Sequence, residues 1–211
     1  MMLRSVLVLA FSVFTLAAPL AAQAPEGWRV RVDRSANASD PDDVPDLTVV
    51  TMGKGFRATG GPAGTFWNPT NRVTGNYTAK ATFNLMKPSG HNNYYGLVFG
   101  GSDLDGAAQK YVYFMVAQDG TFLIRSRAGE QVQDVQARMA HASVRRPGAD
   151  GRSTNTLEVR VAGNTVSYVV NGTVVHSGPK SGATAATDGF VGARINHVLD
   201  VQVENFEVAR Q

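Results

Sequence analysis

The sequence predicts an all-β protein, a two-sheet antiparallel β-sandwich of the jelly-roll class. Three observations support this fold class. From Trp28 onward, polar and apolar residues alternate in almost every segment, as they do in half-buried strands. Gly, Asn, Asp and Pro separate these segments, often as dipeptides typical of hairpin turns. A single domain with so many antiparallel strands buries their apolar faces by packing one sheet against another.

Residues 1–24 have the organisation of a signal peptide. Arg4 precedes an apolar run that ends in small residues at Ala22-Gln23-Ala24, which fits a small-x-small cleavage pattern. Cleavage after Ala22 is the alternative, because Pro25 would otherwise be the first mature residue. We therefore expect a secreted or periplasmic bacterial protein, with a single domain over residues 25–211 and no membrane span.

Strands are assigned from the alternation, which in TAKATFNLM places the apolar residues on one face and the polar residues on the other. We expect one helix, over residues 130–144. The last strand changes phase near Glu204-Asn205, which predicts a β-bulge that keeps Phe206 and Val208 on the core face. The expected strands are 28–33, 47–52, 55–59, 64–68, 77–87, 94–100, 111–118, 121–127, 155–162, 165–170, 173–177, 189–195 and 198–209.

Three dipeptides are expected to form two-residue hairpin turns, which makes the second half of the chain a meander. They are Asp119-Gly120, Gly163-Asn164 and Asn171-Gly172. Asn-Gly and Asp-Gly are favoured in type I′ turns because these residues tolerate positive φ at low steric cost.

The order of features in YYGLVFGG and KYVYFMVAQDGTFLIRSRAGE resembles the middle of a concanavalin A-like lectin/glucanase sandwich of the laminin-G-like kind. The hairpins of NTLEVRVAGNTVSYVVNGTVVH and the closing DGFVGARINHVLDVQVENFEVAR resemble later strands of that family. The same order is similar to that of the bacterial 3-keto-disaccharide hydrolase domain family. The resemblance covers about residues 55–210 and implies a fold more than an activity, because such sandwiches include lectins, glycosidases, lyases and spacers.

Composition excludes several classes of function. The sequence contains no cysteine, which excludes thiol catalysis and cysteine-ligated metal sites. The net charge is +3, and the basic residues are scattered rather than arranged in a stripe. We therefore expect no nucleic-acid partner. No feature of the sequence predicts the oligomeric state.

The sequence carries no catalytic signature, and we predict no catalytic residue. The E-x-D-x-x-E strand of family 16 glucanases, which share the fold of the resembled family, is absent. Asp200 and Glu204 are the nearest pair of carboxylates on one strand face. Four residues along a strand separate them by about 13 Å, which exceeds the spacing of both retaining and inverting glycosidases.

Two acidic segments are candidates for calcium, the one cofactor that the sequence suggests. SDPDDVPD contains Asp40, Asp42 and Asp43, and GGSDLDG contains Asp103 and Asp105. Clustered carboxylates suit Ca²⁺, and many laminin-G-like modules bind it; solvated acidic loops are the alternative. The four histidines have no metal-ligand spacing in the sequence, so a transition-metal site is not expected. They are His91, His141, His176 and His197.

The predicted ligand-binding surface lies on one sheet. Tyr111, Tyr113 and Met115 share a strand face opposite an apolar one, so we expect the tyrosine face to meet solvent. Aromatic faces beside amide and guanidinium donors suit sugars, whereas tyrosines that only cover core edges are the alternative. The candidate residues are His91, Asn92 and Asn93 in a loop, Tyr94, Tyr113 and Arg125 on adjacent strands, and Trp67 as a further stacking surface.

These observations leave three candidate functions. The leading hypothesis is a secreted carbohydrate-binding module without catalytic machinery, whose partner is a saccharide or a glycan-bearing surface. The second is a glycoside-acting enzyme of the 3-keto-disaccharide hydrolase type, as the resemblance implies, with an acid/base drawn from His91, Asp103 or Asp105. The third is a protein-binding adhesion or spacer domain.

Overall fold

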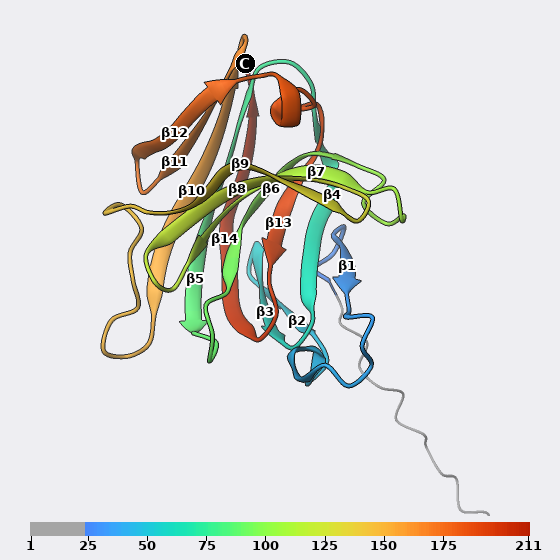
Figure 1. Ribbon diagram of the computed structural model, residues 1–211, viewed down its shortest axis with the longest axis vertical. Coiled ribbons are helices and arrows are strands. Elements are labelled where there is room, and N and C mark those ends of the chain that lie inside the picture. The colour runs from blue at the N-terminus through green and yellow to red at the C-terminus, as the bar shows by residue number, and fades with distance from the viewer. Residues whose placement is uncertain (1–23) are drawn as a thin grey trace, which may run out of the picture.

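A computed structural model describes residues 24–211 and shows an all-β sandwich (Figure 1). The predicted signal peptide lies outside the described residues, apart from Ala24. The described chain contains fourteen strands and two short 3-10 helices, η1 (Pro41–Asp43) and η2 (Gly182–Thr184). Over residues 24–211, no helix is long and apolar enough to cross a membrane.

The fourteen strands form two sheets of seven, and every strand pair is antiparallel. Sheet A has the order β1-β4-β13-β6-β7-β8-β9. Its strands are β1 (Arg29–Asp33), β4 (Ala63–Val73), β6 (Tyr94–Ser102), β7 (Lys110–Ala117), β8 (Thr121–Ala128), β9 (Gln131–Ala140) and β13 (Gly189–Ile195). The predicted fold class is therefore confirmed.

Sheet B packs against sheet A and has the order β12-β11-β10-β5-β14-β3-β2. The hydrophobic residues that face each other between the two sheets make the main core. The strands of sheet B are β2 (Thr48–Met52), β3 (Gly55–Gly60), β5 (Tyr77–Lys87), β10 (Ser153–Ala162), β11 (Thr165–Val170), β12 (Thr173–Pro179) and β14 (Leu199–Arg210).

The predicted alternation describes the core correctly. In β5, Ala79, Ala81, Phe83 and Leu85 are fully buried, and the residues between them are half-buried. Because side chains on a strand point alternately to its two faces, one face of β5 enters the core. The same holds for Tyr95, Leu97 and Phe99 in β6, for Val112, Phe114 and Val116 in β7, and for Leu157, Val159 and Val161 in β10.

The helix predicted over residues 130–144 is wrong, because Gln131–Ala140 forms β9, the edge strand of sheet A. β9 pairs with β8 along its length, with register shifts around Ile124. None of its residues is buried, so neither face needs to be apolar and no alternation appears in its sequence. The ladder with β8 satisfies its backbone and overrides the helix propensity of its Gln, Ala and Arg residues.

The β-bulge predicted in the last strand is confirmed. The register of β14 against β5 shifts between Glu204 and Glu207, and Asn205 has a φ of +49°. Beyond this shift Phe206 and Val208 pack against the core. The Phe206 ring meets Trp28 edge-on, with centroids 5.1 Å apart.

The predicted turn type holds for one hairpin of the three. Asn171 and Gly172 both have positive φ, 50° and 85°, as a type I′ turn requires. At the other two turns the glycines alone have positive φ, Gly120 at 83° and Gly163 at 55°. Those two hairpins therefore form in the predicted places but are not type I′.

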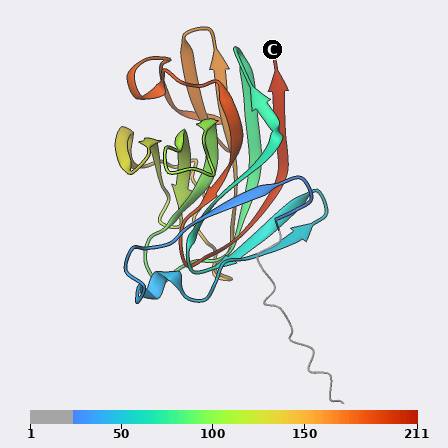
Figure 2. The same ribbon diagram turned by 90° about the vertical axis from the view of Figure 1, so that its right-hand side faces the viewer.

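The connections gather at two ends of the sandwich. Figures 1 and 2 show η1 at one end and η2 with the C-terminus at the other. The β5–β6 loop and the β13–β14 turn lie at the end of η1, which we call the η1 end. Because Tyr94 pairs with Ala117 in the antiparallel ladder, the β7–β8 turn also lies at the η1 end.

Candidate functional site

The outer face of sheet A brings together four of the predicted binding residues, from four strands. Tyr113 in β7 lies opposite Arg125 in β8, and Trp67 comes from β4. Trp67 and Tyr113 belong to a second hydrophobic cluster, separate from the main core, and Tyr94 packs against it. The other buried members of this cluster are Val98, Leu104, Tyr111, Met115 and Leu123.

The centre of this face is covered, so the prediction that it meets solvent is wrong there. Tyr113 is 9% exposed and Trp67 only 2%. Their rings pack against neighbouring side chains and against Leu104, which follows β6. Trp67 offers no free stacking surface in this arrangement, whereas Tyr94 remains partly exposed at the edge of the cluster.

A band of hydrogen-bonded polar groups, which we call the Asp119 band, adjoins Tyr94 at the η1 end. Thr121 donates through Oγ1 to Oδ1 of Asp119 at 2.6 Å, and the Tyr94 hydroxyl lies 3.2 Å from the same Oγ1. Asn92 Nδ2 donates to Oδ2 of Asp119 at 3.1 Å, and Arg138 pairs with that oxygen. The band consists of Asn92, Asp119, Thr121 and Arg138.

An ion pair extends this polar surface along β8 and β9. Arg125 Nε donates to Oδ1 of Asp134 at 2.5 Å, and their side chains are 39% and 47% exposed. Burial alone would lower the pKa of Arg125. The hydrogen bond to Asp134 outweighs this effect and the pKa is raised above its ordinary value, so the guanidinium stays charged. Burial raises the pKa of the Tyr113 hydroxyl, against the opposing charges of Arg194 and Arg125. Sequence reasoning missed Asp119, which it placed only in a turn, and Asp134, which it placed in a helix.

A second charge cluster lies deeper on the same face. Arg194 Nη1 donates to Asp33 Oδ2 at 2.6 Å, to Thr65 Oγ1 at 2.8 Å and to the Tyr111 hydroxyl at 3.2 Å. Burial alone would raise the pKa of Asp33. The Arg194 charge and the hydrogen bonds from Arg31 and Arg194 lower it by more, so the pKa lies below its ordinary value of 3.8. This cluster is internally satisfied, which is typical of a structural role.

The predicted loop residues divide between two places. Asn92 joins the Asp119 band, whereas the Asn93 side chain is buried at the η1 end. Asn93 Nδ2 donates to the carbonyl oxygen of His197 at 2.8 Å and lies 3.0 Å from Nε2 of His91. His91 and Asn93 therefore face His197 rather than the tyrosine surface.

The three carboxylates predicted to bind calcium do not converge. Asp40 Oδ1 accepts a hydrogen bond from the Asp42 backbone at 3.0 Å and caps η1. Asp43 Oδ2 accepts one from the Ser35 backbone at 2.7 Å. Asp42 instead approaches His91 and His197. Among residues 24–211, Asp42, His91 and His197 form the one group of three or more His, Asp or Glu side chains close enough together to hold a metal ion.

The other acidic candidates have protein partners of their own. Asp103 Oδ2 accepts a hydrogen bond from the Ala108 backbone at 3.1 Å, and Asp105 pairs with Arg29 at 3.1 Å. Both belong to the β6–β7 loop, at the opposite end of β6 from His91. The three acid/base candidates of the enzyme hypothesis therefore do not meet in one site.

Asp200 and Glu204 lie on the outer face of sheet B and are also engaged. Asp200 accepts two hydrogen bonds from Arg57, through Nε at 2.7 Å and Nη2 at 2.5 Å. Glu204 accepts from Asn84 Nδ2 at 2.9 Å. These carboxylates form part of a paired polar row, and nothing in their surroundings marks a catalytic pair.

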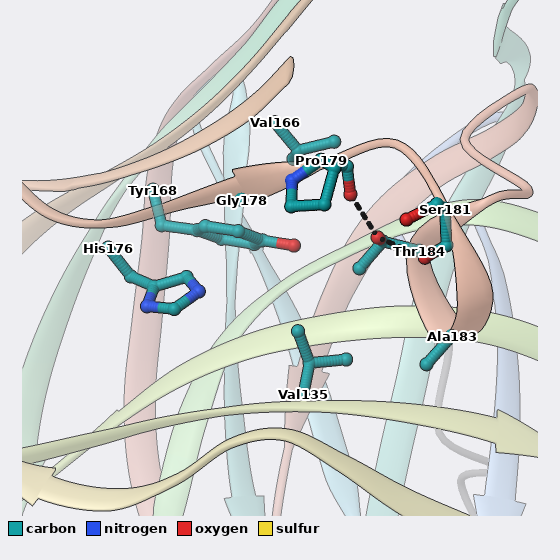
Figure 3. A pocket seen from close by; sticks show the side chains of 9 residues that line it. All are labelled: Val135, Val166, Tyr168, His176, Gly178, Pro179, Ser181, Ala183 and Thr184. Atoms are coloured by element: carbon teal, nitrogen blue, oxygen red, sulfur yellow. Dashed lines mark hydrogen bonds between the residues drawn. The ribbon is translucent and has the colours of Figure 1, made fainter. Parts of the chain in front are cut away.

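A pocket of about 190 Å³ lies near η2, between β9, β11 and β12. In Figure 3 the Tyr168 ring crosses it beside His176, with its hydroxyl directed toward Thr184. That hydroxyl is buried without a hydrogen-bond partner, and burial raises its pKa and lowers that of His176. The pocket is smaller than most ligand pockets and has few convergent polar groups, so we do not place a saccharide there.

A second pocket, of about 300 Å³, opens at the η1 end. Lys87, Ser89 and Gly90 line one side of it, and Val198 and Asp200 line another. Gly90 directly precedes His91 in the chain, and Val198 directly follows His197. Neither pocket is lined by Tyr94, Tyr113 or Arg125.

Comparison with known proteins identifies the fold. The sequence matches no protein-family model and no curated protein. The carbohydrate-binding module CBM66 from Bacillus subtilis has a TM-score of 0.63 at 11% identity, covering 87% of this chain and 96% of that one. A GH16 structure of the Bacteroides ovatus mixed linkage glucan PUL, in complex with its G4G4G3G product, has a TM-score of 0.57 at 10% identity, covering 88% and 96%.

The carbohydrate recognition domain of Emp47p has a TM-score of 0.56 at 10% identity, covering 89% of this chain and 90% of that one. At such low identity these likenesses show the fold, and each aligns most of both chains. Together with the two seven-stranded antiparallel sheets, they show that this chain has the concanavalin A-like lectin/glucanase fold.

Proposed function

We propose that this protein is an exported carbohydrate-binding module whose ligand binds to the Asp119 band and the Arg125–Asp134 pair. Of the three similar structures described above, two are described as a carbohydrate-binding module or a carbohydrate recognition domain. The signal-peptide pattern of residues 1–24 supports export. The ligand class is a saccharide or a glycan-bearing surface.

The observation that carries this proposal is the preorganised band beside a partly exposed tyrosine. Asp119 holds Asn92, Thr121 and Arg138 through side-chain hydrogen bonds. Sugars present neighbouring hydroxyl groups, each of which can both donate and accept. Polar side chains held by one another lose little conformational entropy on binding, and an aromatic ring can cover the apolar face of a sugar ring.

Arg125 and Asp134 supply the complementary half of such a site. Their side chains are partly exposed and held together at 2.5 Å, so the guanidinium presents its remaining N–H donors and the carboxylate its free oxygen. The covered centre of the face, at Trp67 and Tyr113, then acts as a rigid support. Binding at the edge of the sheet therefore needs no rearrangement of the buried rings.

The experiment is a titration of the purified protein with soluble plant and bacterial polysaccharides by affinity electrophoresis and calorimetry. Arg125→Met removes the charged donor, and Arg160→Met is its matched control. Arg160 is also partly exposed and ion-paired, with Glu158 at 2.7 Å, but it lies on sheet B. We expect Arg125→Met to weaken binding by about tenfold, as for one lost hydrogen bond to a charged group, and Arg160→Met to have no effect.

The outcomes separate the candidate functions. No binding to any saccharide, or equal losses in the two variants, would contradict the proposal. A tight protein complex without a saccharide response would favour an adhesion or spacer domain. A new reducing end or keto-sugar product released from a glycoside would favour an enzyme.

A further inference from the structure

We propose that Asp42, His91 and His197 form a binding site for a divalent transition-metal ion, with Zn²⁺ as the best fit. The three residues come from η1, the β5–β6 loop and the β13–β14 turn. This site does not depend on the proposed carbohydrate function, because it uses none of the residues of the Asp119 band or the Arg125–Asp134 pair.

The distances between the ligand atoms suit a tetrahedral ion. Asp42 Oδ2 lies 3.4 Å from Nε2 of His91 and 3.4 Å from Nε2 of His197. Zinc binds nitrogen and carboxylate oxygen at about 2.0–2.2 Å, and tetrahedral geometry then separates neighbouring ligand atoms by about 3.4 Å. The group has one ligand atom from each residue within 4.8 Å of the others, so closing the site requires only a small rotation of the imidazole rings.

The Asn93 amide lies against the ring nitrogen of His91 that would bind the metal ion. Asn93 Nδ2 lies 3.0 Å from that nitrogen, and an amide NH₂ group can only donate. The same Nδ2 donates to the His197 carbonyl oxygen at 2.8 Å, which fixes the orientation of the amide. The contact with His91 uses the Nε2 lone pair that a metal ion would take, so metal binding replaces it and leaves the Asn93 amide on the His197 carbonyl oxygen.

Backbone contacts hold the three segments in place. Asp40 caps η1 and so orients Asp42. The His197 turn is fixed by Val198 N, which donates to the carbonyl oxygens of Gly60 and Gly61 at 3.1 and 2.9 Å. Asn196 N donates to the Tyr94 carbonyl oxygen at 2.9 Å, which ties that turn to β6. The ligands thus lie on a framework that is already assembled.

The donor set and its exposure favour a transition metal over calcium. Calcium takes six to eight oxygen ligands, whereas two imidazoles and one carboxylate suit zinc and its neighbours in the first transition series. The side chains of Asp42, His91 and His197 are 32%, 52% and 37% exposed, so an ion can reach them from solution. Three protein ligands leave at least one coordination position for water or for a donor atom of a ligand.

The test uses the full chain without a polyhistidine tag, stripped with EDTA and dialysed. Calorimetric titration with ZnCl₂ should show one strong site, and CoCl₂ should give the visible absorption bands of four- or five-coordinate Co²⁺. CaCl₂ at the same concentrations should give neither signal. His197→Ala should weaken Zn²⁺ binding by at least about 100-fold, more than the loss of an outer-shell partner does.

His176→Gln is the matched control, because it removes a histidine near η2 and leaves the three ligands intact. We expect it to bind Zn²⁺ like the unmodified protein. Asp42→Asn provides a second variant should His197→Ala fail to fold, since Asp42 is a surface residue of η1. The proposal is overturned if the unmodified protein binds no Zn²⁺, if Zn²⁺ binding survives both ligand variants, or if His176→Gln abolishes it.

Discussion

Arg194 Nη1 donates to Oδ2 of Asp33 at 2.6 Å, which joins two residues 161 positions apart on the outer face of sheet A. Arg31 Nε donates to the other carboxylate oxygen, Oδ1, at 2.7 Å. Arg127 Nη1 lies 3.7 Å from Oδ2 of Asp33. The Asp33 side chain is 13% exposed and that of Arg194 is 10% exposed. One nearly buried carboxylate therefore pairs with three guanidinium groups.

This arrangement predicts that the two partners contribute unequally to stability. Asp33→Asn leaves Arg194 buried without a counter-ion, and breaking such a pair costs about 3–5 kcal/mol of unfolding free energy. Arg194→Met should cost less, because Asp33 keeps Arg31 and Arg127. Urea unfolding followed by tryptophan fluorescence measures both losses.

Asp46→Asn is the matched control for the buried carboxylate. Asp46 pairs with Arg34 at 2.7 Å, but the two side chains are 83% and 51% exposed. Exposed ion pairs contribute less than about 1 kcal/mol. If Asp33→Asn costs no more than Asp46→Asn, the buried cluster does not have the role given to it here.

The pKa values of several paired carboxylates predict how stability varies with pH. Burial raises the pKa of Asp200, but the hydrogen bonds and charge of Arg57 and the Thr59 hydroxyl bring it below its ordinary value. The pKa values of Asp33 and Asp119 are also below their ordinary value. A carboxylate with a lowered folded pKa stabilises the protein fully above its unfolded pKa, about 3.9. It loses that contribution as the pH falls through the folded pKa.

We therefore expect these groups to leave the urea midpoint nearly constant between pH 7 and pH 5. At pH values below about 4, where the carboxyl groups of the unfolded chain bind protons, the urea midpoint should decrease. In Asp200→Asn the protein should be less stable at pH 7, and its decline in acid should be shallower. Unfolding titrations at a series of pH values test this. An unchanged acid decline in Asp200→Asn would contradict the assignment.

The sequence was sufficient for the fold because most strands bury one face. Alternation in segments such as TAKATFNLM reflects the core directly, and every strand expected from it is present. β9 was missed because an edge strand without a buried residue has no alternation to read. What makes it a strand is its ladder with β8, a tertiary contact that local sequence does not encode.

The candidate sites were predictable only in part, for a similar reason. Strand parity placed Tyr113 and Arg125 on one face, and in the β7–β8 ladder these two residues lie directly opposite each other. Parity carries no information on what covers a face, so the burial of Trp67 was missed. The spacing of histidines in the sequence argued against a transition metal, yet folding brings His91 and His197 to a centroid distance of 5.4 Å. Ligands from loops far apart in the chain leave no spacing motif.

The bulge in β14 predicts a marked preference for asparagine or glycine at position 205. Asn205 has a φ of +49°, and for residues with other side chains this left-handed region costs roughly 1–2 kcal/mol. Asn205→Val should therefore lower the unfolding free energy by about that amount, because β-branched residues are the least tolerant of positive φ. Asn205→Gly should be close to neutral, because glycine has no Cβ to clash.

Asn164→Val is the control for the side chain itself. Asn164 is also an exposed turn residue, but its φ is not positive, so this substitution should cost only a few tenths of a kcal/mol, as is usual at the surface. Urea unfolding of the four proteins, including the unmodified chain, measures the differences. Equal losses at positions 164 and 205 would mean that backbone conformation does not set the preference. A loss at position 205 alone would show that the left-handed backbone at the bulge sets the preference.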